Sequence, residues 1–342
     1  MTTIAQDPVA NPPARPAAIA VWIERWLGVY SDAAVRIASV GAVIAAVVAL
    51  LAVVGNVFTR QVLGFSIFGA NELASFAFLW TIWLGVSMAV KRGAVTVITL
   101  LSHQGPALWQ RSVRTFSGLS LGIFLAYACY RSTEFALGRG APAGLTSALE
   151  ISWFYPVVSM TVGFYFITLH YLHALAGEAR GAAERGRAGA TAALSGLAGG
   201  IVVSALIWVT LWAILESGGA PLLAIGVLFV ALTLAGTPIV FMLAIVGIVA
   251  LFSPDFLGLT FYPSIDAMLP FFTSQSTMGL SGGSELLVIL MFLIVAEVMN
   301  ASGLSTRLIA FAASLVAHWR GGMAYVCQLT SAVVSGISGS AS

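Results

Sequence analysis

Charged residues are scarce in this sequence of 342 residues. Asp, Glu, Lys and Arg make up 8% of it, whereas 59% of the residues are hydrophobic. So few charges cannot cover the surface of a water-soluble protein of this length, and the composition therefore predicts an integral membrane protein. The formal net charge of +2 is also too small to indicate a nucleic-acid partner.

Cysteine is rare as well, because the chain holds only Cys129 and Cys327. The two lie far apart in apolar sequence, which argues against a disulfide framework and favours buried packing roles. The N-terminus lacks a basic segment followed by a compact apolar core, so residues 1–20 are interpreted as a flexible tail and not as a cleaved signal peptide.

The apolar residues form blocks of helix-spanning length, without the period-two alternation typical of membrane β-barrels. Helices also satisfy every backbone polar group in lipid, so we predict an all-α integral membrane protein. Four blocks near the length that crosses a bilayer form a predicted four-helix module: Ile37–Phe58, Leu73–Val90, Thr115–Leu137 and Ile151–Leu175.

Ahead of the first block, Trp22, Trp26 and Tyr30 recur at helical spacing and are interrupted by charged residues. This pattern is typical of a helix that lies in the headgroup region of a membrane. We expect residues 1–36 to form a flexible tail and this interfacial helix, and residues 37–175 to form the four-helix membrane module.

Basic residues are unevenly distributed among the connections. Lysine and arginine gather after Val90 and again after Leu175, whereas the other two connections are nearly balanced in charge. The positive-inside rule then places the N-terminus and both basic connections in the cytoplasm.

The stretch GEARGAAERGRAGA, residues 177–190, is a strongly polar break in the interior of the chain and therefore the candidate domain boundary. An apolar segment over residues 191–215 is long enough for one further crossing. We predict that residues 176–217 are a polar linker and a connecting transmembrane helix, and that residues 218–342 are the N-terminal part of a second membrane module.

The second module begins with two shorter apolar segments, residues 220–235 and 238–252, on either side of the predicted turn Gly236-Thr237-Pro238. Residues 284–300 then cross back. From Arg307 the apolar residues repeat on one helix face, which predicts a helix along the membrane surface that ends at Gly321-Gly322.

The closing stretch SGISGSAS offers serine hydroxyls, and its glycines allow the backbone to leave helical geometry. Oxygen ligands suit a hard cation such as sodium, and unwound segments hold coupling ions in transporters. The candidate contacts for sodium or substrate are Ser335, Gly336, Ser338, Gly339 and Ser340, with the ion at Ser338 and Ser340. From composition alone, close helix packing through these small residues explains the stretch equally well.

Three acidic or amide side chains are further candidates. Glu297 and Asn300 end a predicted crossing, where a supporting role at the site and a structural role are equally open. Glu72 follows Asn71 at a helix start, so the favoured role for this carboxylate is a helix cap.

The pattern Gly336-Ile337-Ser338-Gly339 is similar to that around the nucleophile of rhomboid intramembrane proteases. A serine nucleophile needs a general base within hydrogen-bond reach, and no histidine follows Ser338. We therefore expect no catalytic residues and no enzyme activity. His170 and His173 share a helix face, but a pair without a third ligand is weak evidence for a metal, and no cofactor is expected apart from sodium as coupling ion.

Four stretches together resemble the tripartite ATP-independent periplasmic (TRAP) transporter family. Residues 71–93, NELASFAFLWTIWLGVSMAVKRG, resemble its small, DctQ-like subunit. Residues 236–247, 296–324 and 335–341 are similar to stretches of its large, DctM-like subunit, and they occur in the family's order. The resemblance implies a four-helix small-subunit module fused through a linker helix to the start of an elevator-type large-subunit module with a re-entrant hairpin.

The resemblance also implies a function. Members of this family are sodium-driven permeases of the bacterial inner membrane that import an organic acid, such as a C4-dicarboxylate or sialic acid, delivered by a soluble periplasmic binding protein. On this likeness, Ser335 to Ser342 form the tip of the first re-entrant hairpin. A structural membrane scaffold without transport of its own is the alternative.

The family continues past this motif into further helices, a second hairpin and the other half of the site. We therefore expect these 342 residues to be the N-terminal portion of a longer polypeptide that cannot move substrate by themselves.

Overall fold

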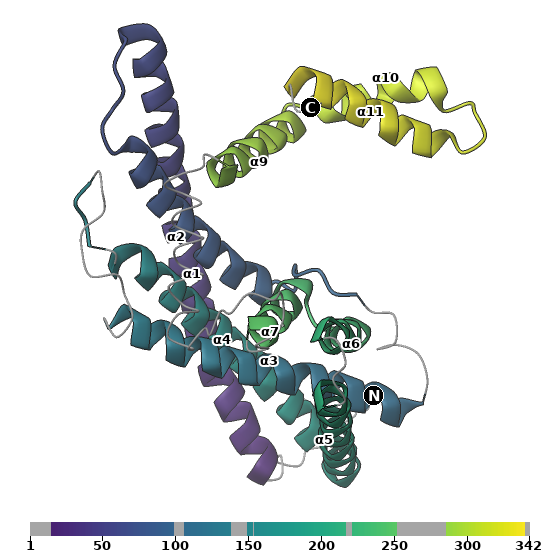
Figure 1. Ribbon diagram of the computed structural model, residues 1–342. Coiled ribbons are helices and arrows are strands. Elements are labelled where there is room, and N and C mark those ends of the chain that lie inside the picture. The colour runs from purple at the N-terminus through teal and green to yellow at the C-terminus, as the bar shows by residue number, and fades with distance from the viewer. Residues whose placement is uncertain are drawn as a thin grey trace, which may run out of the picture. The chain divides into compact units, whose positions relative to one another are not determined.

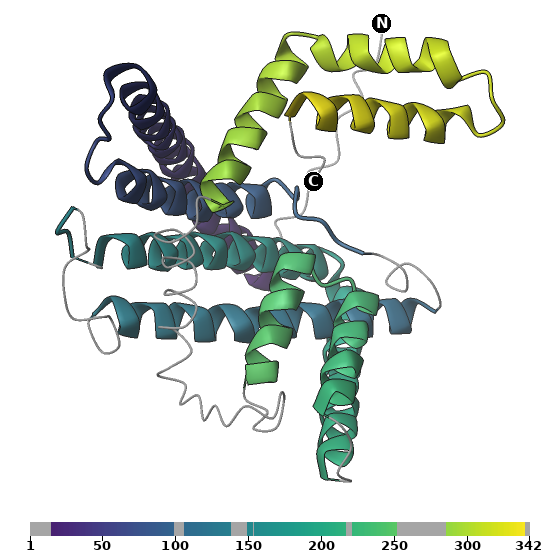
Figure 2. The same cartoon turned by 45° about the horizontal axis from the view of Figure 1, so that its top comes forward.

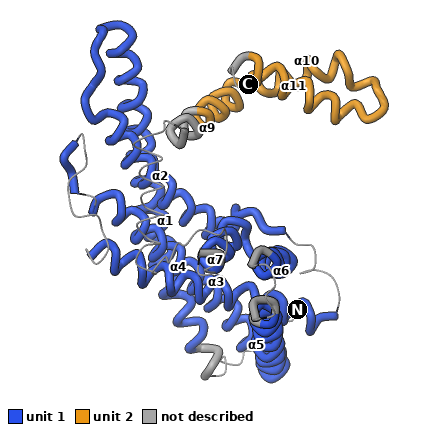
Figure 3. Tube along the Cα trace, viewed as in Figure 1, with its two compact units in different colours: residues 1–278 blue, residues 279–342 orange. Residues whose placement is uncertain are grey.

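The computed structural model describes residues 15–98, 106–137, 149–152, 154–216, 221–251 and 285–338. These residues form helices joined by turns (Figure 1), which confirms the predicted all-α fold. They fall into two compact units, residues 1–278 and residues 279–342 (Figure 3), and each unit is described by itself. The predicted module boundary at residue 217 stays a prediction.

The first unit contains seven described α-helices, and the first of them continues into a π-helical turn, η1. α1, α2 and α4 pack on one another, α3 packs on α4 and α5, and α6 packs on α5 and α7. Their bounds are α1 Arg15–Phe58, η1 Thr59–Leu63, α2 Ala70–Lys91, α3 Ala107–Ala136, α4 Phe154–Glu184, α5 Gly186–Glu216, α6 Pro221–Leu234 and α7 Ile239–Leu251.

The first helix differs from the prediction. We expected a separate interfacial helix before a crossing that starts at Ile37, but both belong to the single 44-residue helix α1. At 1.5 Å per residue this helix is about 66 Å long, roughly twice the thickness of a hydrocarbon core. The charged residues within α1 do not break the helix. Asp32, for example, forms an ion pair with Lys91 of α2 at 3.2 Å. Residues 1–14 of the predicted tail lie outside the described residues. The rest of the predicted tail is helical from Arg15 onward.

The polar linker is also helical in the structure. α4 continues to Glu184 and α5 begins at Gly186, so the chain leaves helical geometry only around Arg185. Gly186 has a φ of +59°, a conformation that glycine adopts at little cost. The charged residues of this segment therefore lie on helical turns beyond the apolar parts of α4 and α5, instead of on a loop.

Small residues let the helices of this unit approach closely. A Cβ atom on Gly199 or Gly200 of α5 would lie within 3 Å of Ser112 or Thr115 of α3, respectively. Gly163 of α4 is equally close to α2. Helices surrounded by lipid gain no hydrophobic energy by associating, so such close van der Waals contact is what stabilises their packing.

The lengths of the helices agree with a membrane protein. Within the described ranges, five helices are long and apolar enough to cross a membrane, and the bent pair of α9 and α10 would make a sixth. α6 and α7, with 14 and 13 residues, are shorter than a full crossing. The chain is thus a multi-pass membrane protein.

The second unit consists of α9 Glu285–Ala301, α10 Leu304–Val316 and α11 Gly322–Ser338. α9 and α10 meet at a bend of 76°, and Gly303 at the bend has a φ of +71°. α10 and α11 pack antiparallel as a helical hairpin (Figure 2). The predicted helix end at Gly321-Gly322 is five residues too late, because α10 already ends at Val316. Gly321, with a φ of +81°, instead closes the turn before α11, which starts at Gly322. The predicted position of α10 on the membrane surface stays a prediction.

Both cysteines are free thiols. Cys129 is partly buried in α3 and lies 3.2 Å from the hydroxyl of Thr168, which agrees with a packing role. Cys327 is exposed on α11, so the buried packing role predicted for it is wrong.

Candidate functional site

The candidate sodium or substrate contacts lie at the C-terminal end of α11. Ser335 is partly buried and Gly336 is exposed. Ser338 is the last residue of the helix, and nothing is described of its side chain. Gly339 and Ser340 lie outside the described residues.

Gly336 does not unwind the backbone as we expected. It lies inside α11, with helical residues on both sides. One glycine in a helix interior costs roughly 1 kcal/mol, which is too little to break a helix that packs along its length against a neighbour. The backbone stays helical up to Ser338, so freed carbonyls are confined to the last turn of α11.

The bend between α9 and α10 is a second polar feature of this unit. Ser305 donates a hydrogen bond from its hydroxyl to Oδ1 of Asn300, at 2.7 Å, and Ser302 accepts a bond from the backbone N–H of Leu304 at 3.4 Å. Asn300 and Glu297 are both exposed. The side-chain oxygens of Asn300, Ser302 and Ser305 therefore hold the bend.

The hairpin returns α11 toward this bend. α10 runs away from the bend and α11 runs back beside it, so the C-terminal end of α11 lies at the same end of the hairpin as the junction of α9 and α10 (Figure 2). Two oxygen-bearing segments that are more than 30 residues apart in the sequence are thus neighbours in space. His318 lies in the turn at the other end of α11, about 25 Å along the helix from Ser338, which is too far for a general base.

Glu72 lies in the first turn of α2, where the helix dipole favours a carboxylate. The N-cap of α2 is Gly69, and no side chain caps the helix there. The carboxylate of Glu72 accepts a hydrogen bond from the backbone N–H of Leu149 at 2.6 Å. The position expected for Glu72 at the start of the helix is thus confirmed, and its carboxylate also holds a backbone group from the connection just before α4.

A buried polar cluster, which the sequence did not reveal as a unit, joins α1, α2 and α4. Ser31 and Nδ1 of His170 are 2.8 Å apart, and His170 is only 3% exposed. Lys91 donates to Nδ1 of His173 at 3.2 Å and also pairs with Asp32. Ser31 is fully buried and His170 nearly so, so this pair packs in the interior of the bundle. Within the part of the chain that the structure describes, no three His, Cys, Asp or Glu residues gather to hold a metal.

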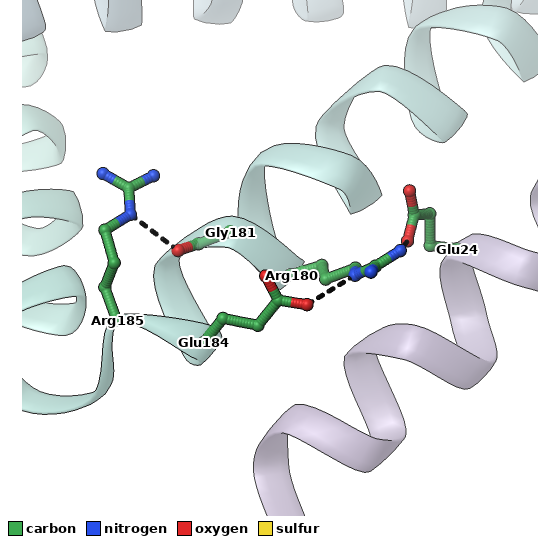
Figure 4. Close-up of polar contacts among 5 residues, drawn as sticks. All are labelled: Glu24, Arg180, Gly181, Glu184 and Arg185. Carbon is green, nitrogen blue, oxygen red and sulfur yellow. Dashed lines mark hydrogen bonds and ion pairs between the residues drawn. The ribbon is translucent and has the colours of Figure 1, made fainter. Parts of the chain in front are cut away.

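A second ion-pair group lies further toward the N-terminus of α1. Arg180 of α4 donates to Glu24 of α1 at 2.8 Å and to Glu184 of its own helix at 2.7 Å (Figure 4). In the same view Arg185 donates to the backbone carbonyl of Gly181 at 2.8 Å. These contacts attach the first turns of α1 to the polar end of α4, and this is why the predicted interfacial helix packs as part of the bundle.

The turn between α6 and α7 docks on the first module. Thr237 is 1% exposed, and its hydroxyl lies 3.0 Å from that of Ser117 in α3. The backbone N–H of Ile239 donates to the carbonyl of Thr96 at 3.1 Å, and Pro238 forms an isolated antiparallel bridge with Val97. Apolar residues of α3, α5, α6 and α7 surround this contact in one shared core. The predicted turn is therefore a junction between the two predicted modules.

Known families match both halves of the chain. Residues 49–181 match "Tripartite ATP-independent periplasmic transporters, DctQ component", and residues 226–342 match "Tripartite ATP-independent periplasmic transporter, DctM component". The two matches together cover more than half of the sequence and follow each other in the order that the motifs predicted.

Several permeases are similar to part of the chain. Two putative TRAP transporter large permease proteins of Haemophilus influenzae are 31% identical over 106 residues and 41% identical over 69 residues, which cover 31% and 20% of this chain. The sialic acid TRAP transporter large permease protein SiaM of Vibrio cholerae is 31% identical over 110 residues, or 32% of this chain. The aligned parts are 22%, 17% and 23% of those proteins, so the chain spans about a fifth of their length.

Proposed function

Because the chain belongs to the tripartite ATP-independent periplasmic transporters, with a DctQ component followed by a DctM component, we propose that it is a membrane permease component of a sodium-coupled importer of organic acids. The observation that carries this proposal is the presence of both components in one chain, packed together at the turn around Thr237. A permease of this kind needs a stationary part and a part that moves, and the DctQ component with its docked turn suits the stationary role.

The proposed coupling-ion contacts are the hydroxyls at the end of α11, Ser335 and Ser338, with Ser340 and the backbone of Gly336 and Gly339. Their support is chemical and topological: the C-terminal end of α11, which carries Ser335, lies at the same end of the hairpin as the bend after α9. Sodium requires several oxygen ligands to replace its water, and two neighbouring segments offer more of them than one. Glu297 and Asn300 have supporting roles in this proposal.

The proposed substrate is a carboxylate. SiaM, whose name specifies sialic acid, is similar to part of this chain and supports sialic acid as one proposed substrate. A C4-dicarboxylate is the second proposed substrate, from the family resemblance. We also propose that a soluble binding protein in the periplasm delivers the substrate to the permease, and that the permease lies in the bacterial inner membrane.

Uptake by membrane vesicles tests this function. The vesicles come from cells that express the gene for this chain at its natural locus, and they receive the binding protein loaded with radiolabelled sialic acid or succinate. We expect uptake of one of the two acids under an inward sodium gradient and loss of that uptake when potassium replaces sodium. Equal uptake with either cation, or equal uptake by vesicles that lack the gene, would reject the sodium-coupled permease.

The proposed orientation places the N-terminus and the segment around Arg185 in the cytoplasm. Its support is the group of arginines at the end of α4 and the start of α5, because cytoplasmic connections carry an excess of Lys and Arg. In a cysteine-free background, Arg185→Cys is expected to resist a membrane-impermeant thiol reagent added to cells whose outer membrane is permeabilised. Phe68→Cys, an 80% exposed position in the α1–α2 connection, is the opposite-side control and should react. The reverse labelling pattern would overturn the orientation.

A further inference from the structure

One face of α1 is exposed along its whole length and changes its chemistry midway. Its first part carries Trp22, Trp26 and Tyr30, which are 61%, 48% and 58% exposed. The rings contact each other in sequence, with centroids 5.9 Å and 6.2 Å apart, so they form one aromatic ladder. The same face then continues with exposed aliphatic side chains: Ile37, Val40, Ile44, Val47 and Leu51.

The aromatic ladder points away from the rest of the protein. Glu24, Gly28 and Ser31 lie roughly half a helical turn away from it, given 3.6 residues per turn. Those three residues face α4, where Glu24 binds Arg180, Ser31 binds His170, and a Cβ on Gly28 would lie 3.2 Å from His173. The inner face of this part of α1 is therefore fixed to the bundle, and its outer face is free for another partner.

Two arginines lie at the edge of this face, roughly a quarter turn from the aromatic ladder and on the same edge as Asp32. Arg25 and Arg36 are both exposed. In an α-helix each Cα–Cβ bond tilts toward the N-terminus, so the long side chain of Arg36 reaches back toward the ladder while its methylene groups lie on apolar surface. The outer face thus combines aromatic rings with positive charge, which matches a layer of anionic phosphate groups.

We infer that this face of α1 binds the headgroup layer of anionic phospholipids, with the ladder crossing that layer and the aliphatic part in the hydrocarbon core. Trp and Tyr prefer this interface, and the ladder covers about 12 Å of the helix axis, enough to cross one headgroup region of roughly 5–8 Å. The pair of Asp32 and Lys91 lies on the helix turn between the two parts, where charged groups still reach water. The positive charge of Arg25 and Arg36 and the aliphatic side chains that continue the same face of α1 favour lipid over protein as the partner.

Spin labels test the depth of this face. In a cysteine-free background, labels at positions 22, 26, 30, 40 and 47 are compared in liposomes for collision with oxygen, which enters lipid, and with a water-soluble nickel complex. We expect positions 40 and 47 to be accessible to oxygen only, and accessibility to nickel to rise stepwise from position 30 to position 22. Full exposure of positions 22, 26 and 30 to nickel, or protection of all three from both reagents, would overturn the inference.

Lipid selectivity tests the charge. The association of spin-labelled phosphatidylglycerol is measured relative to phosphatidylcholine for the wild type and for R25Q/R36Q. We expect the preference for phosphatidylglycerol to fall by up to about fivefold for each arginine. R185Q/R187Q removes the same charge near the end of α4 and is the matched control. An unchanged preference in R25Q/R36Q, or an equal fall in both variants, would show that the outer face of α1 does not recognise anionic headgroups.

Discussion

Gly163→Val is expected to prevent stable packing of α2 against α4. A Cβ atom at Gly163 would lie 2.8 Å from Cβ of Trp83 and 3.3 Å from its backbone oxygen. These atoms belong to the helix itself and cannot rotate away, and the Trp83 ring is held against Phe164 at a centroid distance of 4.8 Å. The two helices would therefore have to separate, at a cost of about 3 kcal/mol or more.

The measurement is thermal unfolding in detergent together with size-exclusion chromatography. We expect Gly163→Val to aggregate and Gly163→Ala to unfold at a clearly lower temperature. Gly85→Ala on α2 is the matched control, because no atom lies within 4 Å of its added methyl group. Alanine favours the helix there by up to about 1 kcal/mol, so this variant should be as stable as the wild type or more stable. A wild-type unfolding temperature for Gly163→Ala would contradict the close contact.

The double variant S335A/S338A is expected to lose sodium-driven uptake. Each substitution removes one proposed oxygen ligand, and a coupling ion that is short of ligands binds more weakly. We expect the uptake rate at low sodium to fall by at least about tenfold, which corresponds to roughly 1.4 kcal/mol of lost sodium binding. Raising the sodium concentration should restore part of the rate, which a misfolded protein would not do.

Ser314→Ala is the control for this experiment. Ser314 lies on the exposed side of α10 and donates only to the carbonyl of Phe311 in its own helix, at 2.7 Å. This variant should keep the wild-type sodium dependence. Wild-type sodium dependence in S335A/S338A as well would show that these hydroxyls do not hold the coupling ion, while leaving the transport function itself intact.

The sequence by itself determined the kind of protein and most of its helices. Apolar blocks of fixed length gave the spans from Ala70 to Lys91 and from Glu285 to Ala301 within three residues, because the length of a crossing is set by the membrane. Gly236-Thr237-Pro238 and Gly321-Gly322 mark turns because glycine and proline act locally on the backbone. The family resemblance depended on such local motifs as well, and the matches to the DctQ and DctM components confirmed it.

Only the tertiary structure decided which faces meet. Glu72 lies at the helix start that its position predicted, but only the structure shows that it also binds Leu149, 77 residues away. Charged residues of α1 suggested a separate surface helix, but Glu24 and Ser31 pair with residues of α4 that are 156 and 139 positions distant. A helical period shows which side chains share a face, and it carries no information about the partner of that face. That choice depends on how closely the helices can pack and on which buried polar groups find each other in lipid, where an unpaired group is costly.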